Sequence, residues 1–227
     1  SAGLLWRLRP ADTDIELIDH TRHLARDVLE EETGLSPGWI ENGGLFIASN
    51  ERRLDEYKRL QTLGKAYGIE SHVCTPDEAQ KIHPLMSTED MYGALYSPND
   101  GTIDPSGWVS ALTKGAKMRG AKIFENCRVT AVDTEATTST GKPKVTGVAT
   151  SQGYIKTNTV VDCAGVWGAN LGSLVGVDVP LVGMRHAYIV MDKVPGIQGL
   201  PNIRDHDLSV YLKLQGDSLA IGGDEVD

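Results

Sequence analysis

The chain has 227 residues, 40% of them hydrophobic, and a formal net charge of −9. This length and composition can bury a core and fit one large or two small globular domains. The acidic balance argues against a nucleic-acid partner, because neutralising phosphates requires clustered Lys and Arg. No run approaches the roughly 18 to 20 apolar residues that cross a bilayer, which argues against a membrane-spanning protein.

Helix and strand patterns alternate along the first half of the chain. Apolar residues at helical spacing predict a helix over residues 14–32, which Gly34 ends. A strand at 44–49 precedes a charged helix at 51–67. Thr75-Pro-Asp-Glu78 combines an N-cap, a first-turn proline and acidic residues, so it predicts a short helix to residue 82. A strand at 93–97 and a helix from Asp104 to about residue 120 follow.

The second half is richer in strands. We predict strands around residue 123 and at 129–134, a polar hairpin loop at 136–144 and a strand at 145–150. Further strands are predicted at 159–162, 181–191, 209–214 and 218–221. The interleaved pattern predicts a mixed α/β (α+β) fold, in which the strands after residue 181 form a mostly antiparallel sheet.

Three cysteines, Cys74, Cys127 and Cys163, lie far apart and show no zinc-binding spacing. We expect no metal site and interpret all three as buried free thiols of a protein from a reducing compartment.

The segment Val160-Val-Asp-Cys-Ala-Gly-Val-Trp-Gly-Ala-Asn-Leu-Gly172 has the layout of a nucleotide-phosphate cradle. Ala164 and Gly165 allow close backbone approach to a ligand, and the helix start that follows offers free N–H groups to an anion. An ordinary strand-to-helix corner explains the segment equally well, so both interpretations stay open on these residues alone.

A period of two residues organises Met184-Arg-His-Ala-Tyr-Ile-Val190. In a strand, this alternation places His186 and Tyr188 on one face and Arg185 on the other. One face then carries an imidazole beside a phenol, which is a candidate substrate site. In the competing interpretation, His186 and Tyr188 are ordinary polar residues on a sheet face that is partly exposed to solvent.

Several motifs resemble the FAD-dependent amine dehydrogenase family, which includes the sarcosine and dimethylglycine dehydrogenases. They are Ser1-Ala-Gly-Leu-Leu-Trp6, Asn42-Gly-Gly-Leu-Phe-Ile47, Asp100-Gly-Thr-Ile-Asp-Pro105, His186-Ala-Tyr188 and Arg204-Asp-His-Asp207, and the resemblance covers essentially the whole chain. It implies a D-amino-acid-oxidase-like fold: part of a Rossmann-like FAD-binding domain plus a substrate domain. The nucleotide side would comprise about 1–35 and 120–178, and the substrate side about 36–119 and 179–227.

The resemblance also implies where FAD would be contacted. Ser1, Ala2, Gly3 and Leu4 match the point where the family's chain passes beside the flavin ring, and the histidine that bonds covalently to the flavin would fall just before Ser1. Val129 matches a backbone contact to the adenine end, although any buried strand favours valine. Trp167 matches a cofactor contact beside Ala164 and Gly165, although tryptophan is also common in cores.

For the substrate, the resemblance implies oxidative demethylation of sarcosine to glycine. Oxidising a secondary amine requires its neutral nitrogen, whose protonation His186 and Tyr188 could control. An arginine fork is a natural partner for the substrate carboxylate, and Arg204 or Arg185 could supply it. We therefore predict His186, Tyr188 and Arg204 as catalytic residues.

Family members pass electrons to an electron-transfer flavoprotein, carry a C-terminal folate-binding domain and act in one-carbon metabolism in the mitochondrial matrix. The chain has neither a G-x-G-x-x-G fingerprint nor a leader peptide, so we expect an internal fragment that is inactive alone, with the main FAD-binding element before Ser1. Dimethylglycine as substrate, or a non-catalytic regulatory subunit of pyruvate dehydrogenase phosphatase with the same fold, stay open as alternatives.

Overall fold

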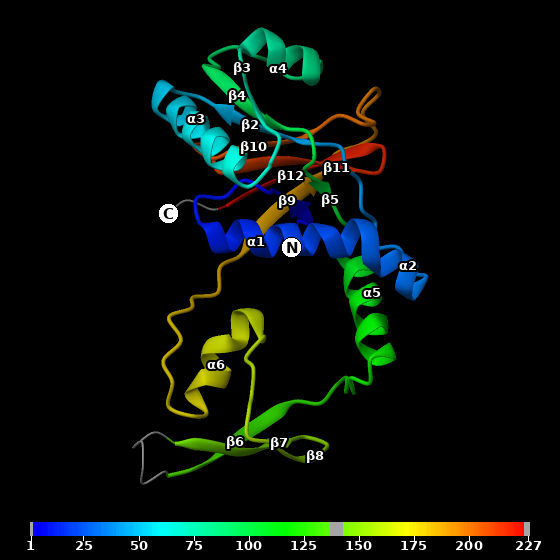
Figure 1. Cartoon of the computed structure of the whole chain (residues 1–227), viewed down its shortest axis with the longest axis vertical. Helices are drawn as coiled ribbons and strands as arrows, with labels where there is room; N and C mark the ends of the chain where they lie inside the picture. Colours follow the sequence, from blue (N-terminus) through cyan, green and yellow to red (C-terminus); the bar gives the residue numbers. More distant parts are fainter. Residues whose placement is uncertain (1, 137–142, 225–227) are drawn as a thin grey trace. The chain divides into compact units, whose positions relative to one another are not determined.

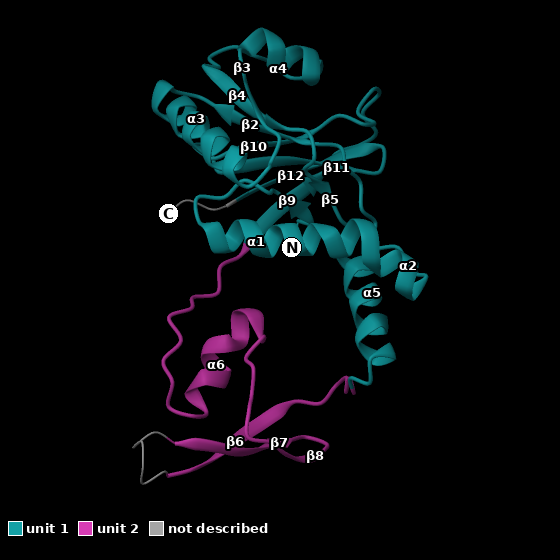
Figure 2. Ribbon diagram, in the orientation of Figure 1, with its two compact units in different colours: residues 1–121, 186–227 teal, residues 122–185 magenta. Residues whose placement is uncertain are grey.

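The computed structural model describes residues 2–136 and 143–224. The chain divides into two units (Figure 2). The first comprises residues 1–121 and 186–227, and the second comprises residues 122–185. Of the predicted hairpin loop at 136–144, residues 137–142 lie outside the described residues. None of the described helices is long and apolar enough to span a bilayer.

A seven-stranded sheet forms the centre of the first unit (Figure 1). Among its described strand pairs, β10 and β2 run parallel and the others antiparallel, which confirms the expected mostly antiparallel sheet. In spatial order the strands are β3 (His72–Cys74), β4 (Gly93–Ser97), β2 (Gly44–Ala48), β10 (Asn202–Asp205), β11 (Val210–Gln215), β12 (Ser218–Asp224) and β9 (His186–Val190).

Alternation along β2 builds a core on each face of this sheet. Phe46 packs with Trp6, with Tyr57 of α3 (Glu51–Ala66) and with Ile15 of α1 (Asp12–His23). Leu45 packs on the opposite face with Ala79 of α4 (Pro76–Ile82). Successive strand side chains point to opposite faces, so one strand serves both cores.

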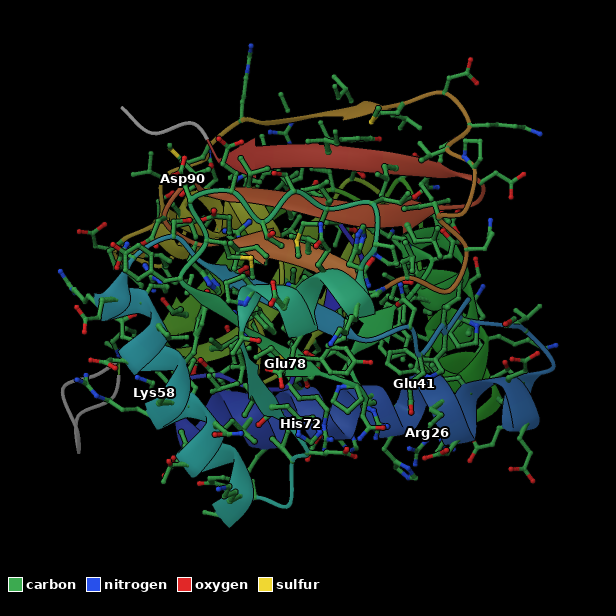
Figure 3. The ribbon with its side chains drawn as sticks, turned by 90° about the horizontal axis from the view of Figure 1, so that it is seen from above. Arg26, Glu41, Lys58, His72, Glu78 and Asp90 are labelled. Atoms are coloured by element: carbon green, nitrogen blue, oxygen red, sulfur yellow. The ribbon has the colours of Figure 1, made fainter. Side chains whose placement is uncertain are left out.

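Local capping signals form the helices where the sequence predicts them. Thr75 and Glu78 make a capping box at the start of α4, and Figure 3 labels Glu78 on this helix. Asn50 accepts the Arg53 N–H at the start of α3. Asp104 caps α5 (Pro105–Met118). The helix predicted over 14–32 forms as α1, a π-helical turn over Leu24–Val28, and α2 (Leu29–Thr33).

The second unit holds a three-stranded antiparallel sheet of β6 (Val129–Glu135), β7 (Lys144–Thr150) and β8 (Gly153–Lys156). A 3-10 turn over Gly165–Trp167 leads into the short α6 (Gly168–Ser173). The strands predicted at 129–134 and 145–150 are confirmed, whereas β8 was not predicted.

Three predicted strands are wrong in whole or in part. Residues 159–162 are not a strand, because no described strand pairs with their backbone groups, and Val161 is 76% exposed. The region around Ile123 leads instead into a turn in which Asn126 has a φ of 54°. The strand predicted over 181–191 begins only at His186, where pairing with β12 starts.

The expected burial of the thiols is also wrong in part. All three cysteines are free, but only Cys74 is buried, whereas Cys127 is half-buried and Cys163 is exposed. Cys74 packs against α4, and burial raises the pKa of its thiol.

Candidate functional site

The first unit contains a cavity of about 610 Å³ on the sheet face that carries Tyr188 and Tyr211. Side chains of three strands line it together with the N-terminal segment and the start of α5. The lining residues are His186, Tyr188, Val190, Tyr211, Lys213, Gln215, Ala220, Ala2, Pro105 and Ser106.

Strand register places the chemistry-bearing side chains in this wall. Tyr188, Gly222 and Tyr211 are direct partners across β9, β12 and β11. A side chain at Gly222 would begin 2.3 Å from the Tyr211 hydroxyl, so the missing side chain leaves room for the phenol. The structure therefore places two phenols and the imidazole of His186 around one cavity, with His186 and Tyr188 on the shared face that the alternation predicts.

The N-terminal segment reaches the cavity through Ala2. The Ile103 N–H donates to the Gly3 carbonyl (2.8 Å), and Leu4 pairs with Thr102 where β1 (Leu4–Leu5) meets β5 (Gly101–Thr102). Gly3 has a φ of 73°, and a β-carbon there would lie 2.4 Å from the Ile103 carbonyl oxygen. Only glycine fits this position. Ser1 lies outside the described residues.

The buried carboxyl group of Asp100 holds the N-terminal segment in place at Arg7. Asp100 is fully buried, and its Oδ1 accepts the Arg7 N–H (3.0 Å). Its Oδ2 has no well-formed hydrogen bond in the described part of the chain, although the Ser97 hydroxyl lies beside it. Burial raises the pKa of Asp100 to about 7, more than the Arg7 N–H lowers it.

Lys213 is the cavity residue that the sequence predictions missed. It is 7% exposed, and burial lowers its pKa, which the charge of Asp104 partly offsets. The pattern Val210-Tyr-Leu-Lys-Leu-Gln215 gives only a partial signal, because it groups Lys213 with Tyr211 and Gln215 on one face of a strand. Its polar residues alternate with apolar ones, as in the strand that carries His186.

Neither predicted carboxylate partner is among the described residues that line the cavity. Arg204 is half-buried on β10, opposite Tyr211 in the register. Arg185 is exposed and directly precedes β9. Both roles stay predictions.

The other residues of the motif around Arg204 build a second, separate region. His206 stacks on Phe46 with ring centroids 5.7 Å apart and lies 3.1 Å from the Tyr57 hydroxyl through its Nδ1. Burial, with the charges of neighbouring arginines, lowers the His206 pKa to about 4. Asp205 accepts the Ser49 hydroxyl. These contacts give His206 and Asp205 an architectural role.

In the second unit, the segment predicted as a nucleotide-phosphate cradle, all of which the structure describes, has a 3-10 turn and a short helix, but no strand before them. The Ala164 N–H donates to Asp162 Oδ1 (3.0 Å), and Gly165 has a φ of 57° with open space where a β-carbon would project. Trp167 is 68% exposed, and Val129 opens β6 at 37% exposure. The glycine and the indole are thus open on their exposed sides, whereas α6, with six residues, is a weak anion site.

Comparison with known proteins assigns the chain to a family. The family described as FAD dependent oxidoreductase matches residues 1–227. The chain is 56% identical to the mitochondrial sarcosine dehydrogenase of Homo sapiens over 225 residues, which are 99% of this chain and 24% of that protein. It is 32% identical to the mitochondrial dimethylglycine dehydrogenase of Rattus norvegicus, and the match covers 98% of this chain and 26% of that protein.

A solved structure, L-proline dehydrogenase from P. horikoshii, matches 97% of this chain and 57% of its own with a TM-score of 0.81 at 22% identity. This likeness, with the family match, confirms the expected mixed α/β fold of the D-amino-acid-oxidase type. The chain spans about a quarter of the length of the two dehydrogenases.

Proposed function

The chain belongs to the family of FAD-dependent oxidoreductases, and we propose that it is the part of a sarcosine dehydrogenase that holds the amine substrate. One observation carries this proposal: His186 and Tyr188 share a cavity with Ala2, the residue expected beside the flavin ring. The similarity to the human sarcosine dehydrogenase along almost the whole chain supports sarcosine as the substrate. Dimethylglycine remains the runner-up, because one methyl group changes pocket discrimination by only ~1 to 3 kcal/mol.

FAD, when bound, supplies the acceptor for the hydride that leaves the N-methyl carbon of sarcosine. The nitrogen lone pair then forms the C=N bond, and hydrolysis releases glycine and a one-carbon unit at the formaldehyde level. His186 and Tyr188 keep the amine neutral by exchanging its proton and orient the C–H bond that breaks. Tyr211, opposite Tyr188 across Gly222, closes the wall behind the substrate.

Two groups of residues are proposed to hold FAD. The segment Ser1, Ala2, Gly3 and Leu4 would run beside the isoalloxazine ring. Val129, Ala164, Gly165 and Trp167 would contact the nucleotide part, and the open space at Gly165 and the exposed indole fit this role. We accordingly propose a nucleotide side at about 1–35 and 120–178 and a substrate side at about 36–119 and 179–227.

The remaining parts of the activity are proposed to reside outside this chain. They are a histidine before Ser1 that bonds to the flavin, the main pyrophosphate loop, and a C-terminal folate-binding domain. Electrons would pass to an electron-transfer flavoprotein in the mitochondrial matrix, in agreement with the mitochondrial relatives. The 227-residue chain alone is therefore expected to be inactive.

Anaerobic mixing of the purified full-length flavoprotein with sarcosine or dimethylglycine tests this proposal. We expect sarcosine to bleach the flavin absorbance faster than dimethylglycine does. Faster bleaching by dimethylglycine would assign the enzyme to that substrate. Bleaching by neither compound would favour the alternative of a regulatory subunit of pyruvate dehydrogenase phosphatase.

A further inference from the structure

Lys213 presents a buried cation to the cavity. It lies on β11, where its direct partner on β12 is Ala220 and the next strand contributes Val190. Its Nζ lies 3.2 Å from the position that a β-carbon on Gly3 would take. The ammonium group therefore sits beside the N-terminal segment, and only 7% of the residue is exposed.

This ammonium group has no partner in the described part of the chain. None of the hydrogen bonds or ion pairs there involves Lys213 Nζ. Asp104 contributes charge at a distance, but its two carboxylate oxygens already accept the N–H groups of Ser106 and Gly107. A largely desolvated charge without a protein partner is costly, and an anion bound in the cavity would offset that cost.

The start of α5 borders the same cavity. Pro105 and Ser106 line it, and they are the first two residues of this 14-residue helix. The N–H groups of this helix end are already bonded, because Ser106 and Gly107 donate to the Asp104 carboxylate and Trp108 donates to the Asp104 carbonyl. In this wall, Lys213 is therefore the group that favours a small anion.

We propose that Lys213 forms the subsite for the substrate's carboxylate group. The inference rests on the proposed function, which brings an N-methyl amino acid into this cavity. Lys213 is two residues from Tyr211 along β11, which separates their rows by about 7 Å. The substrate then lies diagonally across β12, with its carboxylate at Lys213 and its amine beside Tyr188 of β9.

This assignment gives Lys213 the role that the sequence alone gave to Arg204. The lysine lines the cavity, whereas the arginine is not among the described residues that do. An ammonium group can bind a single carboxylate as a guanidinium does, because both are charged hydrogen-bond donors. An arginine variant of Lys213 keeps the charge and so separates charge from shape.

Methoxyacetate is a suitable probe, because it keeps the carboxylate of sarcosine and replaces the amine by an ether oxygen. Its affinity for the full-length flavoprotein can be titrated from changes in the flavin spectrum, without turnover. We expect Lys213→Met to weaken methoxyacetate binding about tenfold to a hundredfold, since it removes a charged hydrogen bond. Lys213→Arg should retain most of the affinity. Lys81→Met, at an exposed position on α4, is the matched control and should bind as the wild type does.

Unchanged methoxyacetate affinity in Lys213→Met would overturn the proposal, and a larger loss in Arg204→Met than in Lys213→Met would return the role to the arginine. A shift of the flavin midpoint potential in Lys213→Met, with methoxyacetate affinity unchanged, would also overturn it by assigning the lysine to the flavin. Lys213-dependent methoxyacetate binding in a protein that sarcosine does not reduce would support the anion subsite while the proposed reaction fails.

The pH dependence of methoxyacetate binding to the wild type provides a test that does not require Lys213→Met to fold. Burial lowers the Lys213 pKa, so methoxyacetate affinity should fall as pH rises into the range where this lysine loses its proton. The other titratable groups that face it are Asp104, His186, Tyr188 and Tyr211. Lys213→Arg should remove the fall, because a guanidinium keeps its charge. The same fall in wild type and arginine variant would contradict the proposal.

Discussion

Replacing Asp100 by asparagine should change how the stability of the chain depends on pH. Asp100 lies fully buried beneath the segment that leads to the cavity, where its Oδ1 accepts the Arg7 N–H. Burial raises its pKa to about 7, from the ordinary value of 3.8. Asparagine keeps the accepting oxygen and the shape of the side chain but cannot ionise.

The direction of the effect follows from proton linkage. Between pH 4 and pH 7 the folded chain holds a proton on Asp100 that the unfolded chain has lost, so the free energy of unfolding falls as pH rises. The full loss is about 4 kcal/mol, which is the pKa difference times about 1.4 kcal/mol per unit. About 3 kcal/mol of it falls between pH 5 and pH 8.

Asp100→Asn should therefore gain stability relative to the wild type by about 3 kcal/mol from pH 5 to pH 8. A constant offset of about 1 kcal/mol in either direction is expected from the new NH₂ group, which needs an acceptor such as the Ser97 hydroxyl. Urea unfolding of both chains at several pH values, followed by circular dichroism, measures the difference. Because all other titrating groups are shared, parallel stability curves for the two chains would refute a raised Asp100 pKa.

Three further predictions concern the cavity and the cofactor contacts. Gly165→Val should lower the flavin content of the full-length protein more than its folding yield. A normal flavin content in absorbance spectra would show that this segment is an ordinary strand-to-helix corner. Gly3→Ala should reduce thermal stability by about 1 to 3 kcal/mol more than Gly34→Ala, since both have positive φ but only Gly3 lacks space; equal melting temperatures would contradict this. Tyr188→Phe should slow sarcosine-driven flavin reduction in anaerobic stopped flow and displace its pH profile, whereas Arg185→Lys should not.

Most helices and several strands were predictable because their signals are local. Thr75, Pro76 and Glu78 encode the start of α4 within four residues, and the structure forms the capping box that they predict. The short strand β3 has three residues and depends on pairing with β4, about twenty residues further along the chain. Such a strand leaves almost no periodicity to detect. Non-local pairing also decides whether residues 159–162 form a strand. Their apolar composition favours one, but no described strand pairs with them.

The difference between local signals and non-local pairing also explains which site residues could be predicted from the sequence. Alternation assigns a face within one strand, so His186 and Tyr188 could be grouped without knowing their neighbours. It does not say which strand comes next, and β11 reaches β9 only through β12, with a register that no local pattern contains. Lys213 was therefore invisible as a cavity residue, although its own strand alternates equally clearly. A lysine that alternates with apolar residues is also what the solvated face of an antiparallel strand carries, so the sequence of Val210–Gln215 does not contain the burial of Lys213. That burial follows only from the sheet, because β12 and β9 lie beside β11 and the N-terminal segment reaches the lysine. The proposed carboxylate subsite therefore depends on the register and not on the pattern of any one strand.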